Sequence, residues 1–339
     1  MRTVIRISLI IWIISLAADG YGDTLVPAEM YRESSQCILE GRYDEAERVL
    51  DRFITEHQDE PSGYLLKAAA LHHRAVDYED FSRSGEFRTL LDRAEALAVK
   101  KSAANSRDLW AKFFLHSART FRGAWEVSNG SFVRGMMQGR SGANGMARIL
   151  EADPHFYDAY LGDGSYRFWK STTVRGMHLS RLAGDARARG IGEVRESIGR
   201  GKLTGPLSQT VLLEMLLEYD PASAAKEASE LVRRYPGCRL FAWQLGEAHK
   251  KRGDFDAAER VFTALAERYA NDPADDGSGQ VRCWWKLAVL ANDLGKKEEC
   301  GKYCERIAVA GGREPVRTRQ AKRLEGARKM LLEMNRERN

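Results

Sequence analysis

Gly253-Asp254-Phe255-Asp256-Ala257-Ala258 is the stretch of sequence that decides the fold. Its glycine follows an apolar, helix-forming segment, and the small residue Ala258 opens a second such segment. Two further stretches share this layout, Gly41-Arg42-Tyr43-Asp44-Glu45-Ala46 and Gly295-Lys296-Lys297-Glu298-Glu299-Cys300. In all three, an interval of nine residues leads from the end of the first segment (His249, Cys37 or Ala291) to the small residue. A constant interval of this kind indicates an internal repeat of helical hairpins.

Each position of the pattern has a steric reason. A glycine ends the first helix because a left-handed residue closes the turn there without a clash of its Cβ. Where the two helices of a hairpin cross, the side chains must be small so that the backbones can approach. The expected crossing residues are Gly246, Ala288 and Ser34 on the first helices and Ala258, Cys300 and Ala46 on the second. A single hairpin cannot bury its apolar stripe alone, so neighbouring hairpins must stack.

The pattern resembles the tetratricopeptide repeat, in which Trp-x2-Leu-Gly-x2-Tyr is followed by Ala-x3-Phe and then Pro. The resemblance implies an all-α fold, an α-solenoid of about six or seven hairpins. The clearest copies cover residues 28–61, 238–273 and 281–311, within repeats expected over residues 21–313. Residues 314–339 are amphipathic and strongly charged, which predicts a C-terminal capping helix and tail.

A second resemblance concerns the middle of the chain. The block Tyr157-Asp158-Ala159-Tyr160-Leu161-Gly162-Asp163-Gly164-Ser165-Tyr166, with Gly184-Asp185 and Tyr235-Pro236 downstream, is similar to a group of diverged bacterial tetratricopeptide proteins that carry export signals. That group has no assigned activity. The resemblance therefore bears on fold and compartment.

The first residues have the layout of a secretory signal peptide. Arg2 and Arg6 precede twelve uncharged residues, 7–18, and Asp19 follows. A helix needs ~20 apolar residues to span a bilayer, so this segment is too short for a stable transmembrane anchor. We expect residues 1–20 to be removed before Tyr21 and the protein to be periplasmic or secreted. The alternative is a short buried helix.

The composition of the chain bears on the kinds of partner that it can bind and on its cysteines. The chain has 339 residues, of which 43% are hydrophobic and 30% charged. Its net charge is +5, and the basic residues are distributed along the chain beside acidic ones. Nucleic-acid binding is not indicated, because it requires clustered basic residues on one face. Five cysteines are too few for a disulfide scaffold. Cys283 and Cys304 fall near neighbouring ends of two antiparallel helices, which suggests a disulfide between them.

No motif commits the chain to a reaction. Ser223 and Lys226 have the spacing of a nucleophile pair, but the companion motifs of a penicillin-binding site do not occur. No zinc, phosphate-loop or cofactor signature is found, so no catalytic, metal-binding or cofactor-binding residue is predicted. Residues 171–189 depart from a compact hairpin, between helices expected at residues 156–170 and 191–199. The wider connector, residues 171–202, leaves open an alternative, an envelope enzyme related to the cell wall with its site there.

The repeat register predicts a binding groove. In the closest copy Leu245, Gly246 and His249 face the partner helix, so the opposite stripe is exposed. The stripe carries Trp243, Glu247 and Lys250, and the next copy presents Trp285, Val289 and Asn292. In the family this resembles, such a face lines a concave surface that takes up peptides or partner helices. The alternative is that both tryptophans pack between repeats.

The resemblance thus implies a non-enzymatic interaction scaffold or adaptor of the bacterial cell envelope, which binds a peptide or partner segment in its concave face. A purely structural subunit of an envelope complex is the remaining alternative. The sequence indicates neither the partner nor the oligomeric state.

Overall fold

A computed structural model describes residues 28–176, 185–205 and 208–338. Within those ranges the chain forms sixteen helices and no strand, which confirms the all-α prediction. The signal-peptide prediction falls outside the described residues. The helices are α1 (Ala28–Leu39), α2 (Tyr43–Glu56), α3 (Pro61–Tyr78), α4 (Ser84–Ala104), α5 (Leu109–Ser128), α6 (Phe132–Ala152), α7 (Ala159–Gly176), α9 (Arg187–Arg200), α10 (Gln209–Tyr219), α11 (Pro221–Arg234), α12 (Arg239–Arg252), α13 (Phe255–Ala270), α14 (Ser278–Asp293), α15 (Lys297–Ala310), α16 (Val316–Arg319) and α17 (Ala321–Arg338).

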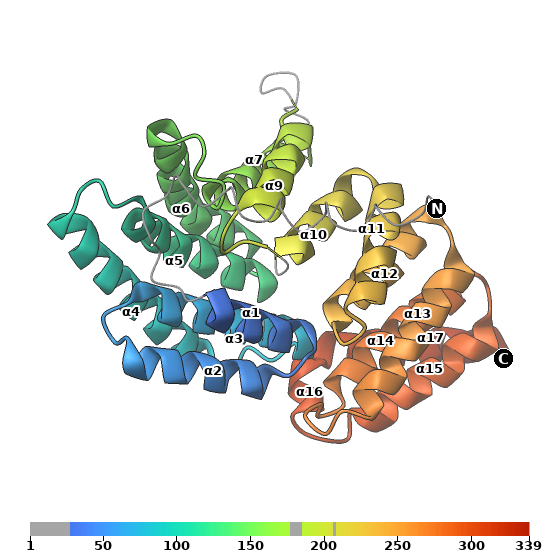
Figure 1. The fold of residues 1–339 in the computed structure, drawn as a ribbon. Coiled ribbons are helices and arrows are strands. Elements are labelled where there is room, and N and C mark those ends of the chain that lie inside the picture. The colour runs from blue at the N-terminus through green and yellow to red at the C-terminus, as the bar shows by residue number, and fades with distance from the viewer. Residues whose placement is uncertain (1–27, 177–184, 206–207, 339) are drawn as a thin grey trace, which may run out of the picture.

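Consecutive helices pair into antiparallel hairpins that stack side by side (Figure 1). In the described part of the chain the pairs are α1/α2, α3/α4, α5/α6, α7/α9, α10/α11, α12/α13 and α14/α15. The three predicted turn glycines have positive φ, at 74° for Gly41, 81° for Gly253 and 71° for Gly295. At Gly246 an added Cβ would lie 2.7 Å from the ring of Phe262, so the crossing requires a glycine. The solenoid predicted from the repeat is confirmed.

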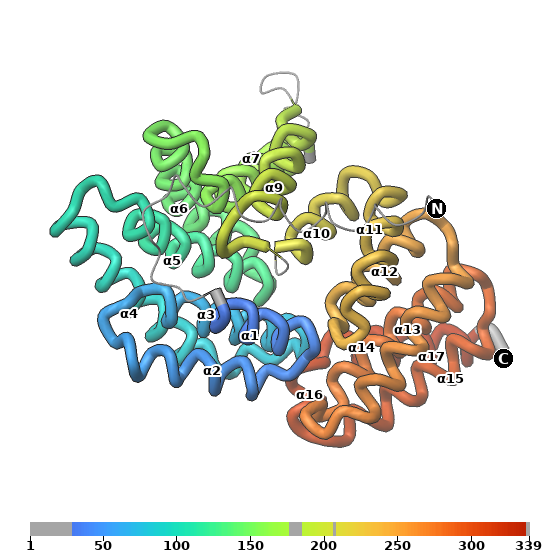
Figure 2. The backbone as a smooth tube through the Cα atoms, viewed as in Figure 1, coloured from blue at the N-terminus to red at the C-terminus, as the bar shows by residue number. Residues whose placement is uncertain are grey.

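The two ends of this stack meet, so the solenoid closes into a ring (Figures 1 and 2). One apolar cluster contains Cys37, Ile38 and Tyr43 from the first hairpin together with Trp243 and Phe262 from the sixth. In addition α3 packs directly against α14. Closure buries faces that would otherwise be the exposed ends of an open solenoid.

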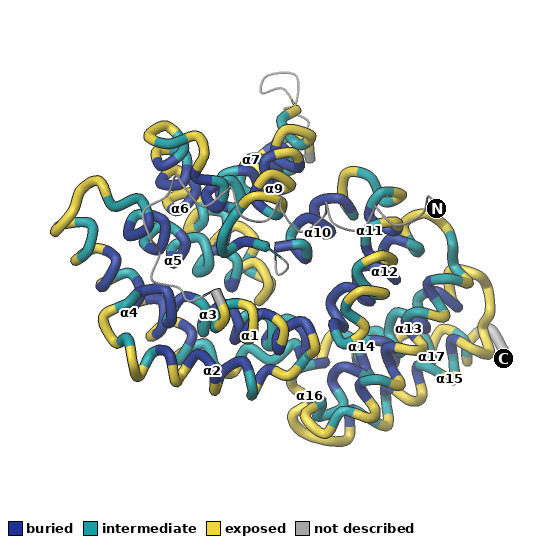
Figure 3. Tube along the Cα trace, viewed as in Figure 1, coloured by how far each residue is buried: buried dark blue, intermediate teal, exposed yellow. Residues whose placement is uncertain are grey.

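Helix α1 lies beside α2 and α3 on one side of the ring (Figure 2). Near the start of α1, the Tyr31 hydroxyl donates to the backbone carbonyl of Leu203 at 2.8 Å. Just after α1 ends, the Cα of Glu40 lies so close to Gly237 that a Cβ added to Gly237 would be 2.7 Å from it. The C-terminal residues of α1, Cys37, Ile38 and Leu39, are all buried, as Figure 3 shows for this part of the chain. The first helix therefore contacts both the segment that follows α9 and the segment that precedes α12.

Two segments differ from the sequence predictions. The predicted C-terminal capping helix is divided into α16 and α17, because the buried side chain of Gln320 turns inward between them to contact Glu79. The stretch 171–189, expected to depart from a compact hairpin, is helical up to Gly176 at the end of α7 and again from Arg187 at the start of α9. Among the described helices, none combines the length and the apolar character needed to cross a membrane.

Candidate functional site

The structure places Trp243 in the core, and the prediction that its ring lines an open groove is wrong. The residue is 6% exposed, and its indole nitrogen donates to the hydroxyl of Tyr269 at 3.0 Å. The register did place Trp243 and Leu245 on different faces of α12, but both faces are covered. The face of Trp243 packs on Phe262 of α13 and on the first hairpin through Cys37 and Tyr43, and the face of Leu245 packs on the α10/α11 hairpin.

The other predicted groove residues lie on the adjacent first helices α12 and α14, and three of them contact residues of a neighbouring helix. Glu247 of α12 forms an ion pair with Lys286 of α14 at 2.7 Å, and Lys250 lies 4.0 Å from Asp293. The Trp285 ring packs against α17, where an added Cβ on Gly326 would lie 2.4 Å from it. Val289 is half-buried and Asn292 is exposed. These contacts join neighbouring repeats, as the alternative prediction for the tryptophans stated.

The disulfide predicted between Cys283 and Cys304 is not formed, since both are free and buried. Cys283 packs into the cluster that joins the two ends of the ring. Cys304 belongs to the C-terminal cluster, with its Sγ 3.9 Å from the Sδ of Met330. Burial raises the pKa of each thiol to about 12, so both remain protonated and poorly reactive.

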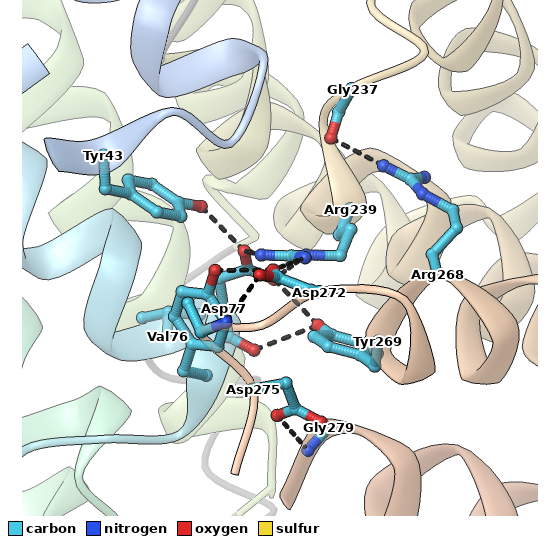
Figure 4. Close-up of polar contacts among 12 residues, drawn as sticks. Tyr43, Val76, Asp77, Gly237, Arg239, Arg268, Tyr269, Asp272, Asp275 and Gly279 are labelled. Atoms are coloured by element: carbon cyan, nitrogen blue, oxygen red, sulfur yellow. Dashed lines mark hydrogen bonds and ion pairs between the residues drawn. The ribbon is translucent and has the colours of Figure 1, made fainter. Parts of the chain in front are cut away.

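A buried ion cluster fastens the ring where its ends meet (Figure 4). At its centre is Asp77, from the last turn of α3, whose side chain is 1% exposed. Its carboxylate accepts hydrogen bonds from the hydroxyls of Tyr43 and Tyr269, at 2.9 and 2.7 Å. Arg239, at the start of α12, donates to the same carboxylate through Nε at 3.0 Å and through Nη2 at 2.6 Å. Every oxygen of this carboxylate is thus engaged.

The electrostatics of the cluster follow from its burial. Burial by itself would lower the pKa of Arg239, but the Asp77 carboxylate outweighs it and raises that pKa, so the guanidinium stays charged. Burial, followed by the charge of Asp77, raises the pKa of Tyr43 and Tyr269 well above the ordinary value. The phenols therefore act as hydrogen-bond donors to a fixed ion pair. We assign the cluster a structural role in closing the ring.

Beside this cluster, arginines hold the end of α3. Arg282 of α14 donates to the backbone carbonyl of Asp77 at 2.7 Å, where the last carbonyls of α3 lack helical partners. Glu79 follows in the left-handed region, with φ of 50°. Its carboxylate forms ion pairs with Arg282 at 3.0 Å and with Arg323 of α17 at 2.6 Å. The sequence pattern did not point to Asp77 or Glu79, because their partners lie in distant repeats.

A cavity of about 690 Å3 lies between α9 and α11. We call it the α9–α11 groove. Its floor is apolar and its rim is charged. It is lined by Arg195, Ile198, Gly199, Gln209, Leu212, Leu213, Glu227, Glu230, Leu231, Arg233 and Arg234. The groove exists because α10, with only eleven residues, packs less extensively on α9 than other hairpins pack on their predecessors.

Charge is distributed unevenly around the α9–α11 groove. Arg195 of α9 and Glu227 of α11 form an ion pair that bridges its two walls. The charges of this pair cancel. The charges that remain on the rim are the positive charges of Arg233 and Arg234 and the negative charge of Glu230. These residues follow no pattern of the repeat. The signal that could have found them is the short helix α10, from Gln209 to Tyr219, which cannot fill the space beside its longer neighbours.

The residues considered for catalysis have structural partners. The Ser223 hydroxyl donates to Asp220 at 2.6 Å, and Asp220 in turn caps the first turn of α11. In the α7/α9 hairpin, Arg167 forms ion pairs with both Asp163 and Glu193. Among the described residues, no three His, Cys, Asp or Glu side chains gather closely enough to hold a metal ion.

Comparison with known proteins bears on the sixth hairpin. Residues 242–272, which span most of α12, all of α13 and the first residues beyond it, match the family model of the tetratricopeptide repeat. No curated protein matches the chain.

Proposed function

We propose that this chain, whose residues 242–272 match the tetratricopeptide repeat, is an adaptor that binds a helical segment of a partner protein in the α9–α11 groove. The repeat itself indicates a protein–protein interaction module. The observation that carries the finer proposal is the groove, whose volume is in the range of pockets that enclose ligands or several side chains. We propose in addition that it works outside the cytoplasm, in the cell envelope, which rests on residues 1–20 of the sequence.

The shape of the groove favours a helix as its occupant. Its walls are the second helices of two adjacent hairpins, and α10 forms the floor through Leu212 and Leu213. Residues 227–234 extend along one wall for roughly 10 Å, at 1.5 Å per residue, which is about two helical turns. An amphipathic helix laid into such a groove contacts it through side chains spaced three or four residues apart.

The chemistry of the groove specifies the helix further. Ile198, Leu212 and Leu231 call for apolar side chains on the buried face. Arg233 and Arg234 favour a carboxylate on the flank of the partner, because charge-assisted hydrogen bonds to arginine are strong and directional. The expected partner segment is therefore an amphipathic helix with one or more acidic residues beside its apolar stripe.

A glycine in the wall allows the groove to be filled without disturbing the fold. Gly199 lines the groove, and an added Cβ there would meet no atom within 4 Å. Gly199→Trp should therefore fold normally and occupy the space of the partner helix. Gly192 is a matched control in the same helix, exposed and equally unobstructed, but outside the groove.

The test is affinity capture from a native envelope extract with immobilised wild-type, Gly199→Trp and Gly192→Trp proteins. We expect at least one protein to be retained by the wild type and by Gly192→Trp but not by Gly199→Trp. The dissociation constant of that partner should rise at least about tenfold for Gly199→Trp, as is usual when a central contact of an interface is blocked. Identical retention by all three proteins would show that the groove is not the binding site.

A further inference from the structure

Exposed apolar side chains are concentrated at one end of the α5/α6 hairpin. Of the nine large apolar residues that are exposed in the described chain, four fall between positions 127 and 137. They are Val127 at 39% exposure, Phe132 at 40%, Val133 at 72% and Met137 at 72%. We call these four residues the α5–α6 tip. Contiguous apolar exposure of this kind marks a contact surface, whereas single exposed apolar residues are ordinary.

The same segment is basic and contains no acid. Residues 127–150 include Arg134, Arg140 and Arg148 but neither Asp nor Glu. Glu126, directly before this segment, forms an ion pair with Arg134 at 3.5 Å. All three arginines are exposed. Along α6 the exposed positions Val133, Met137, Asn144 and Arg148 follow helical spacing, so one face of the helix runs from apolar at the tip to basic further along.

Close packing makes the hairpin rigid up to its tip. An added Cβ on Gly123 of α5 would lie 2.7 Å from the backbone oxygen of Gly135 and 2.8 Å from the backbone nitrogen of Gly139. Further along, an added Cβ on Gly142 would lie 2.2 Å from the Thr120 hydroxyl. The two backbones therefore touch over several turns, and the apolar side chains at the end are presented outward.

This combination fits a lipid surface. The four residues of the tip line neither the α9–α11 groove nor the smaller cavity beside Trp125, so they present an exposed surface rather than a recess. Amphipathic segments of interfacial proteins bury apolar residues ~5–10 Å into the headgroup boundary and keep basic residues on the polar side. Arg140 follows Val133 by seven residues, or roughly 10 Å of helix, which places it at headgroup depth when the tip is inserted.

We propose that the α5–α6 tip is a membrane-contact site, which inserts Phe132, Val133 and Met137 into the interface of an anionic lipid bilayer. Arg140 binds the anionic headgroups. The inference is independent of the α9–α11 groove, because it concerns a different hairpin and a different ligand.

The experiment is sedimentation of the protein, residues 21–339, with lipid vesicles. This chain retains every described helix and lacks the apolar segment 7–18, which would itself bind lipid. We expect binding to vesicles that contain phosphatidylglycerol, weaker binding to phosphatidylcholine alone, and a decrease with added salt. Substituting both Val133→Asp and Met137→Asp should weaken binding at least about tenfold, because insertion of the apolar side chains is lost.

Val309 provides a matched control, since it is 80% exposed and lies on α15, on the other side of the ring from α5 and α6 (Figure 1). Val309→Asp should bind vesicles as the wild type does. The proposal is overturned if the wild type does not bind, if the tip variant binds equally well, or if Val309→Asp loses as much. It is also overturned if the tip variant changes only the oligomeric state, which would assign the tip to self-association.

Discussion

Replacing Asp77 with Asn tests whether the buried ion cluster closes the ring. The substitution keeps the size of the side chain but removes its charge. Arg239, whose side chain is 7% exposed, would keep only Asp272 as an anionic partner. Breaking a buried ion pair from one side costs about 3–5 kcal/mol, because the remaining charge is left without compensation. Since the amide oxygen still accepts a hydrogen bond and Asp272 remains, we expect a loss near the lower end, about 3 kcal/mol.

Urea denaturation, followed by circular dichroism, measures this loss. Unfolding free energies of native proteins lie at about 5–15 kcal/mol, so a loss of ~3 kcal/mol is a large part of the total. With a denaturant slope of about 3 kcal/mol per molar, the midpoint should fall by roughly 1 M urea. Glu196→Gln serves as the control, because it breaks the exposed ion pair with Arg200, where the loss should stay below about 1 kcal/mol.

A double variant separates the ion pair from other effects of the substitution. Arg239→Met removes the second charge, so Asp77→Asn combined with Arg239→Met leaves no unpaired arginine in the cluster. The loss in the double variant should be smaller than the sum of the two single losses, by at least ~1 kcal/mol. Strict additivity, or a loss below ~1 kcal/mol for Asp77→Asn alone, would refute the conclusion that this ion pair holds the ring together.

Two further predictions concern the interiors of single hairpins. Burial lowers the pKa of His72 to about 3, whereas an unfolded histidine titrates near 6.5. As the pH drops, the unfolded chain therefore binds a proton at this histidine before the folded chain does. The free energy of unfolding consequently falls between pH 6.5 and pH 3. In denaturant titrations His72→Phe should lose less stability than the wild type between pH 6.5 and 4, by on the order of 2 kcal/mol; equal losses would contradict the assignment. Gly246→Ala should destabilise by ~1–3 kcal/mol, because its Cβ would meet the buried Phe262 ring. The matched change Gly192→Ala, in an unobstructed helical position, should stabilise slightly, and equal effects of the two would argue against the crossing.

The sequence alone predicts the features that depend on residues close together in the chain. The turn at Gly253 needs a left-handed residue, and the crossing at Gly246 needs a small one, so both leave a mark at a fixed spacing. Repetition of that spacing predicted the stack of hairpins. Stacking of each hairpin on the next is a local rule, which follows from the apolar stripe that one hairpin cannot bury.

Closure of the ring could not be predicted in this way. Asp77 and Arg239 lie 162 residues apart, and nothing in the repeat spacing relates them. The error at Trp243 has the same origin. Helical register correctly separates the two faces of α12, but only the three-dimensional path of the chain shows that α1 and α2 cover the second face. Whether a helix face of one repeat is exposed therefore depends on how the whole ring is arranged.

Closure also determines where partners can bind. In an open solenoid the face of α12 that carries Trp243 would be free for a ligand, but here α1 and the ion cluster around Asp77 use it. The short helix α10 packs less extensively on α9 than other hairpins pack on their predecessors. The deficit at α10 therefore persists as the α9–α11 groove. The proposed binding surface therefore lies where the stack of hairpins is least complete. The hairpin that matches the tetratricopeptide family model helps instead to close the ring.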